Sequence, residues 1–206
     1  MFRKAKESSN RLTRLLESEP NVPLKTVLVN PDLSVSLRNE SQLLMNYFLP
    51  ESGDRKVLRE LIDWALTNKR NENKDDFIYN RNAANVLTCV SKKFHNALYK
   101  DGTLLKELKS FINNSHYNES PSLSGQFSAI FLQHTRQTNF IFFKENPDFY
   151  LKILDHIHLL SYQRILIDTL SETDVINNLK PEKITVDLSN RALETDLKNE
   201  EISHGI

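Results

Sequence analysis

The sequence is short of residues on which several protein classes depend. Its 206 residues include one cysteine, Cys89, so no internal disulfide framework can form and a reducing compartment is expected. Only four glycines are present, fewer than a sheet protein with many tight turns usually needs. Lys and Arg number 27, and so do Asp and Glu. The chain therefore lacks the basic surplus of general nucleic-acid and membrane binders, and we expect neither as a partner.

Long apolar runs are also missing. No stretch approaches the roughly 20 apolar residues of a membrane span. The first residues, MFRKAKESSNR, are charged where a secretory signal needs an apolar segment. We therefore expect a cytoplasmic protein, with the nucleus as an alternative.

Apolar residues recur instead at helical spacing. The stretch NAANVLTCVSKKFHNALYKDGTLLKELKSF, from Asn82 to Phe111, is in helical phase and pauses at Ser91 and at Asp101. Serine and aspartate commonly cap the first turn of a helix, so a new helix is predicted after each of these two residues. Ser120-Pro121 shows the capping residue followed by proline that is common at a helix start. The same pattern predicts helices near residues 10–16, 23–30, 32–49, 54–65, 77–90, 146–157 and 161–170.

The helical units begin at a regular interval. Their starts lie near Asp32, Phe77, Pro121 and Ser161, about 40 to 45 residues apart, which is the range of HEAT and armadillo repeats. Such a unit cannot bury its apolar face alone and stacks on its neighbours. We predict an all-α fold of HEAT/armadillo-like stacked helical repeats, a short α-solenoid, over residues 1–172. We expect residues 173–206 to form a divergent, partly disordered tail.

No group of residues in the sequence indicates catalysis or metal binding. Cys89 has no basic neighbour at a fixed helical spacing, so we expect a core role. His156 and His158 are two residues apart, which points their rings to different helix faces. No glycine-rich phosphate loop and no nucleophile elbow occurs. We therefore predict no enzyme activity, no cofactor and no metal.

An aromatic cluster allows two interpretations. It consists of Phe140, Phe142, Phe143, Phe149 and Tyr150. A partner-binding patch is one interpretation, and a packed junction between two helices is the other. We favour the junction, because uncovered Phe side chains promote aggregation.

Many short segments of the chain follow the order of one known family. These segments are MFRK, Leu15-Leu16, QLLMNYFLPES, VLRELIDWAL, ANVLT (Ala84–Thr88), Asn96-Ala97-Leu98, Leu104-Leu105 with Leu108, Ser110-Phe111, Ser122–Phe131, Phe149 with Leu151 and Leu154, His156-Ile157 and Ser161–Leu170. Together they resemble the SAPS domain, the region shared by regulatory subunits of protein phosphatase 6 and its yeast Sit-type relative. The resemblance spans roughly Leu12 to Ser171, and the chain departs from the family pattern beyond it.

The resemblance implies a non-catalytic function. A subunit of this family binds the catalytic subunit of a Ser/Thr phosphatase and helps to choose its substrates, often together with ankyrin-repeat subunits. An unrelated helical-repeat adaptor for protein–protein interaction is the alternative. A helical RNA binder has only Lys92-Lys93 and Lys69-Arg70 in its support.

The resemblance also allows candidate contact residues to be named. If the chain binds a phosphatase, polar residues near the ends of adjacent helices should make the contacts, and the candidates are Asn82, Asn85, Asp155, His156 and Tyr162. The alternative is that residues such as Asn85 and His156 only satisfy neighbouring backbone groups. For the core, we predict that Leu87, Leu105, Leu108, Phe127 and Ile157 are buried.

Overall fold

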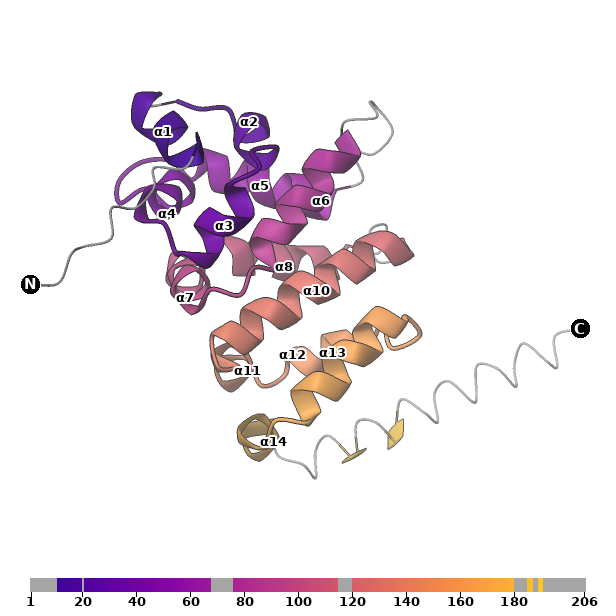
Figure 1. Cartoon of the computed structure of the whole chain (residues 1–206). Coiled ribbons are helices and arrows are strands. Elements are labelled where there is room, and N and C mark those ends of the chain that lie inside the picture. Colours follow the sequence, from indigo (N-terminus) through magenta and orange to yellow (C-terminus); the bar gives the residue numbers. More distant parts are fainter. Residues whose placement is uncertain are drawn as a thin grey trace, which may run out of the picture. The chain divides into compact units, whose positions relative to one another are not determined.

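The computed structural model describes residues 11–19, 21–67, 76–114, 120–179, 185–186 and 189–190. Across these residues the chain forms thirteen helices and no strand, which confirms the predicted all-α class (Figure 1). Within the same ranges, none of the helices combines the length and the apolar character that crossing a membrane requires.

The chain divides into two compact units, residues 1–113 and residues 114–206. This boundary falls inside the predicted repeat domain of residues 1–172. The stacking of repeats into a solenoid remains a prediction.

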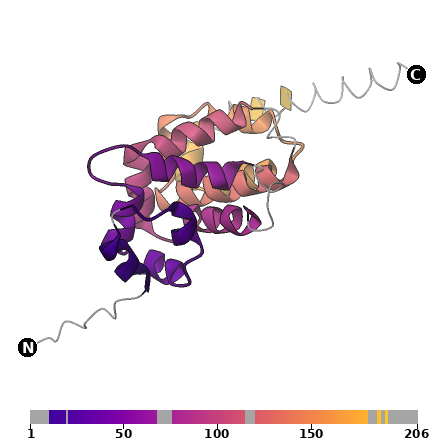
Figure 2. The same cartoon turned by 90° about the horizontal axis from the view of Figure 1, so that it is seen from above.

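The first unit is built around α5. Its helices are α1 (Arg11–Ser18), α2 (Leu24–Leu28), α3 (Leu33–Arg38), α4 (Gln42–Phe48), α5 (Lys56–Leu66), α6 (Asp76–Leu87), α7 (Lys92–Asp101) and α8 (Thr103–Ile112). Helix α5 packs against α2, α4, α6 and α8, and Figure 2 shows the helices from above. Its Leu58, Leu61 and Ile62 are buried, as the helical spacing of these residues requires.

One helix ends and another begins near both predicted capping points, but the N-cap of α8 is Gly102 and not Asp101, which is the last residue of α7. Ser91 precedes α7, and its hydroxyl accepts a hydrogen bond from the backbone N–H of Phe94 at 3.1 Å. Gly102 ends α7 with φ 77, a left-handed conformation that glycine adopts without strain. The carboxylate of Asp101 accepts a hydrogen bond from the backbone N–H of Thr103 at 3.3 Å, at the start of α8.

The predicted helix over residues 32–49 is wrong, because two helices lie there. Glu40 has φ 51, which interrupts the helix between α3 and α4. A non-glycine residue in this conformation needs support from its surroundings. Glu40 has such support, because its carboxylate accepts a hydrogen bond from the Ser91 hydroxyl at 2.8 Å. The break is therefore supported by a contact 51 residues away in the sequence.

The second unit contains α10 (Pro121–Gln137), α11 (Ile141–Glu145), α12 (Phe149–Leu154), α13 (Leu160–Leu170) and α14 (Thr173–Leu179). Helix α13 packs against α10, α12 and α14. Proline in the first turn of α10 confirms the start predicted at Ser120-Pro121. Helix α14 lies in the predicted tail, most of which is outside the described residues.

The aromatic cluster is a packed junction, as predicted. Its five residues are all buried. Phe131 of α10 stacks on Phe149 with ring centroids 5.6 Å apart, and it meets Phe142 edge-on at 5.4 Å. The cluster includes α11, a short helix that the sequence pattern did not predict.

The predicted core is confirmed in part. Leu87, Leu108 and Phe127 are fully buried. Leu105 is only half-buried. Ile157 is 38% exposed, because α12 ends at Leu154 and Ile157 lies in the turn that follows.

Candidate functional site

Two of the predicted contact residues, Asn82 and Asn85, belong to the first unit and lie on α6. Asn82 is half-buried, and its carboxamide donates a hydrogen bond to the backbone oxygen of Leu28 at 2.8 Å. Leu28 is the last residue of α2, where helix carbonyls lack partners within the helix. Asn82 therefore has a structural role, whereas Asn85 is exposed and accessible to a partner.

A third asparagine on α6, Asn80, was missed by the sequence analysis. It is 1% exposed and donates hydrogen bonds to the backbone oxygens of Trp64 at 2.6 Å and Thr67 at 3.3 Å. Both acceptors lie at the C-terminal end of α5. Asn80 thus donates hydrogen bonds to carbonyl groups at the end of α5, as Asn82 does at the end of α2. The sequence could have indicated this role, because Asn80 lies on the apolar stripe of its helix, which faces the core. A buried carboxamide there needs hydrogen-bond partners.

In the second unit, Tyr162 lies in the core rather than at the surface. It is fully buried, and its ring stacks on Phe127 of α10 with centroids 5.5 Å apart. Burial raises the pKa of its hydroxyl above the usual value. Tyr162 therefore belongs to the apolar stripe of α13, contrary to the interpretation that placed it outside the stripe, and its side chain is not accessible to a partner.

Asp155 and His156 follow α12 and lie close to this packed tyrosine. Asp155 is exposed, and His156 is half-buried with its ring centroid 5.2 Å from that of Tyr162. The rings of His156 and His158 are 6.4 Å apart. No group of three His, Cys, Asp or Glu side chains in the described part of the chain is arranged to hold a metal ion. Of the five candidates, Asn85, Asp155 and His156 thus remain accessible.

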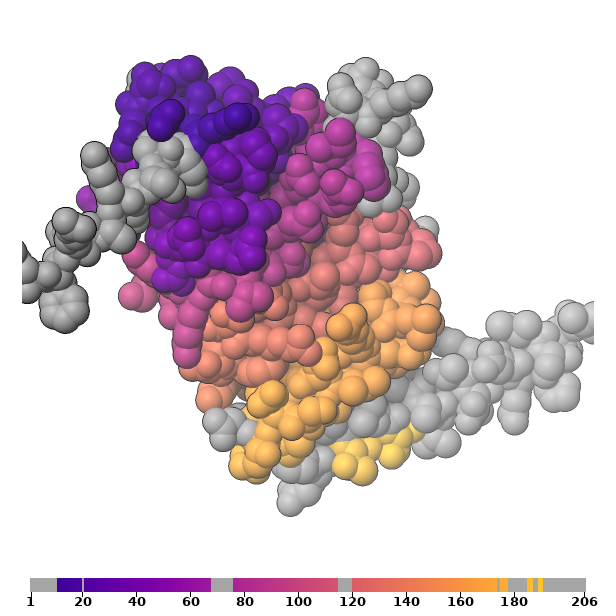
Figure 3. Space-filling model, viewed as in Figure 1, coloured from indigo at the N-terminus to yellow at the C-terminus, as the bar shows by residue number. Residues whose placement is uncertain are grey.

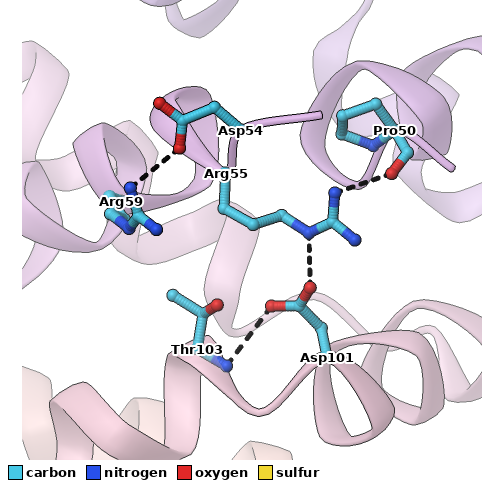
Figure 4. Close-up of polar contacts among 6 residues, drawn as sticks. All are labelled: Pro50, Asp54, Arg55, Arg59, Asp101 and Thr103. Atoms are coloured by element: carbon cyan, nitrogen blue, oxygen red, sulfur yellow. Dashed lines mark hydrogen bonds and ion pairs between the residues drawn. The ribbon is translucent and has the colours of Figure 1, made fainter. Parts of the chain in front are cut away.

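A charged cluster joins the start of α5 to the junction of α7 and α8 (Figure 4). Arg55 forms an ion pair with Asp101, and its guanidinium also donates a hydrogen bond to the backbone oxygen of Pro50 at 2.7 Å. Asp101 is mostly buried. Burial alone would raise the pKa of Asp101, but the hydrogen bonds from Arg55 and Thr103 outweigh it and lower the pKa below its usual value. The carboxylate therefore stays charged and joins the two segments.

The neighbouring pair in the same view serves as a contrast. Arg59 and Asp54 form an ion pair at 2.8 Å, and both side chains are largely exposed. Exposed pairs of this kind contribute little stability, about 0 to 1 kcal/mol. The Arg55 cluster is structural, because its partners are the backbone and an adjacent helix end.

In the first unit, buried His95 contacts the backbone of Cys89, which is half-buried and not in the core as predicted. A ring nitrogen of His95, Nε2, lies 2.9 Å from the backbone oxygen of Cys89. Burial lowers the pKa of His95, although the contact with the carbonyl opposes the shift. Burial raises the pKa of the Cys89 thiol to about 11, so the thiol is protonated at neutral pH. A protonated thiol is a weak nucleophile, which does not fit a catalytic role.

A shallow crevice in the first unit has no interior space large enough for a water molecule. Its lining consists of Ser36, Leu37, Glu40, Ser41, Leu44, Met45, Phe48 and Phe94. Ligand pockets typically have a volume of about 300 to 1,000 Å³. The crevice does not provide a small-molecule site.

The accessible candidates Asn85, Asp155 and His156 are polar side chains that are exposed or half-buried. Comparison of the chain with protein-family models, with curated proteins and with solved structures found no match.

Proposed function

We propose that the chain is a non-catalytic regulatory or scaffold subunit that binds the catalytic subunit of a Ser/Thr protein phosphatase, of the protein phosphatase 6 or Sit type, and influences its choice of substrate. The observation that carries the proposal is the order of the segments that resemble the SAPS domain. They follow one another along roughly 160 residues, from Leu12 to Ser171, as they do in that family.

The distribution of these segments over the helices supports the proposal. QLLMNYFLPES includes α4, and VLRELIDWAL lies within α5. ANVLT includes the last residues of α6, and the Ser161–Leu170 segment covers nearly all of α13. Segments that coincide with helices include the residues that pack in the core. Segments scattered through loops would give weaker support for a shared fold.

We also propose that the helices stack as repeats of about 40 to 45 residues, and that ankyrin-repeat subunits join the complex. Stacked repeats offer long surfaces, and such surfaces bind other proteins.

Affinity purification tests the proposal directly. The tagged full chain is expressed in cells, isolated with its partners, and the partners are identified by mass spectrometry. A Ser/Thr phosphatase catalytic subunit should be enriched over a matched tag-only control, with ankyrin-repeat proteins among the further partners. Reproducible enrichment of other proteins without any phosphatase would refute the proposal.

Enrichment of other proteins without a phosphatase would favour the alternative function, a helical adaptor with an unrelated partner. The observation in its favour is that no family model matches the chain, although its helices bury an ordinary apolar core. The same purification separates the two functions, because each predicts a different protein at the top of the enrichment.

A further inference from the structure

Two aromatic rings of the first unit hold a positively charged group. The ammonium nitrogen of Lys25, in α2, lies 4.8 Å from the ring centroid of Trp64 in α5 and 4.9 Å from that of Tyr79 in α6. Both distances are within the limit of about 6 Å for a cation–π interaction. The two rings, which we call the aromatic pair, have centroids 5.5 Å apart and planes inclined at 58°. They therefore face one common position, and an ammonium group occupies it.

The position of the aromatic pair does not depend on Lys25. Helices α5 and α6 pack directly against each other, and the Asn80 carboxamide donates a hydrogen bond to the backbone oxygen of Trp64 at 2.6 Å. Helix α2 is anchored separately, by its buried apolar side chains and by the hydrogen bond from Asn82 to the backbone oxygen of Leu28. The Lys25 side chain can therefore leave the rings while the rings and α2 keep their places.

The ammonium group of Lys25 is an exchangeable occupant. Lys25 is exposed and Tyr79 is half-buried, and Figure 3 shows the indigo atoms of the first helices at the surface of the first unit. At an exposed site, each cation–π contact shifts an equilibrium by only about two- to fivefold. A lysine ammonium is also strongly hydrated, which opposes its transfer from water onto the rings. A cation that is less strongly hydrated can therefore compete for the same position.

The chemistry of this occupant indicates the class of ligand. A quaternary ammonium group carries the same charge as lysine but has methyl groups in place of N–H groups, so it gives up less hydration and adds apolar contact with the rings. Aromatic rings that face one position are the arrangement by which proteins recognise choline and methylated lysine. An anionic group does not fit, because the faces of aromatic rings are electronegative.

We propose that Trp64 and Tyr79 form a binding site for a quaternary ammonium group, and that Lys25 occupies this site while no ligand is bound. The site is independent of the proposed phosphatase function. Two sources carry such a group, a small choline-like molecule and a trimethylated lysine side chain, and comparing both as ligands distinguishes them.

Titration of the full chain with choline, followed by tryptophan fluorescence, tests the inference. Trp64 is the only tryptophan in the chain, so a change in emission reports on the site itself. Sodium chloride keeps the total chloride concentration constant throughout. Lys25→Ala removes the competing ammonium from two rings and should bind choline about four- to 25-fold more tightly than the wild type. Adding Tyr79→Leu to this variant removes one ring and should weaken binding by about two- to fivefold.

Matched controls separate charge from shape and the site from the rest of the unit. 3,3-Dimethylbutan-1-ol has the shape of choline without the charge, and it should cause no saturable change. Lys106 of α8 is exposed and Tyr99 of α7 is half-buried, so Lys106→Ala and Tyr99→Leu match the two site substitutions. Both should leave choline binding within about twofold, because they lie away from the site. Circular dichroism checks that each variant is folded, and if Tyr79→Leu is not, the neutral analogue still tests the role of charge.

Each outcome decides the inference. Choline binding that Lys25→Ala strengthens and the neutral analogue does not reproduce supports it. Equal responses to choline and to the neutral analogue would overturn it, because apolar contact alone would explain them. Equal affinities of the wild type and Lys25→Ala, or no saturable response in a folded Lys25→Ala, would overturn it as well. Where binding is found, the tighter of choline and N-acetyl-trimethyllysine amide identifies the source of the group.

Discussion

Three asparagines on α6 provide a graded test of how the first unit is held together. Asn80 is buried with two hydrogen bonds to backbone oxygens at the end of α5. Asn82 is half-buried with one bond to the end of α2, and Asn85 is exposed. Each is replaced by alanine in a separate variant. The gain in helix propensity, about 0.6 kcal/mol, is nearly the same in all three, so differences between variants report the lost contacts.

The expected costs follow from the contacts. Asn80→Ala leaves two carbonyls without this partner in a buried site, and the free energy of unfolding should fall by about 2 to 3 kcal/mol. Asn82→Ala loses one bond in a half-buried site and should cost about 1 kcal/mol. Asn85→Ala should stay within about 0.5 kcal/mol of the wild type.

The single tryptophan makes the assay specific to the first unit. Trp64 lies in α5, and it is the only tryptophan in the chain. Its fluorescence during urea titration therefore follows the unfolding of that unit. With a denaturant slope of about 1 to 3 kcal/mol per molar, the midpoint of Asn80→Ala should lie about 0.5 to 3 M below that of Asn85→Ala. Equal midpoints for these two variants would refute the structural role of Asn80.

Four further outcomes are expected from polar and aromatic side chains. Arg55→Met should lower the free energy of unfolding by about 1.5 to 3 kcal/mol, and Arg59→Met should change it by less than about 0.5 kcal/mol, as measured by urea titration. Because the pKa of Asp101 is lowered in the folded state, the unfolded chain binds protons first, so wild-type stability should fall as the pH drops below about 4 and fall less steeply in Arg55→Met. The lowered pKa of His95 likewise means that stability should fall as the pH drops below about 6.5, and urea midpoints of His95→Gln between pH 5 and 8 should lack this part of the change. Tyr162→Ala should cost about 3 to 5 kcal/mol in thermal unfolding followed by circular dichroism, with phosphatase binding lost only in proportion to the unfolded fraction.

Local signals in the sequence were sufficient to predict most helix starts. Ser91 caps α7, and Ser120-Pro121 begins α10, because capping depends on residues within one turn. The break at Glu40 was not predictable in this way, since glutamate has no preference for a left-handed conformation. Its support comes from Ser91, far along the chain, and a contact of that kind is not visible in a local pattern.

The candidate site was predicted less well, because a polar atom does not fix where a side chain lies. Tyr162 has a hydroxyl but buries its ring against Phe127, and the apolar body determined its position. Asn82 was predicted to lie near a helix end, but it lies in the middle of α6, and its carboxamide donates a hydrogen bond to the end of α2.

The most direct test of the proposed function is the mass of a mixture of the chain and a purified protein phosphatase 6 catalytic subunit. The two are combined at about 10 µM each, well above the Kd of a stable complex, and analysed by size-exclusion chromatography with multi-angle light scattering. If the chain binds the catalytic subunit, one new peak should appear whose mass equals the 24.0 kDa of this chain plus that of one catalytic subunit. Two peaks with the separate masses, from a chain that is folded by circular dichroism, would contradict the proposed function.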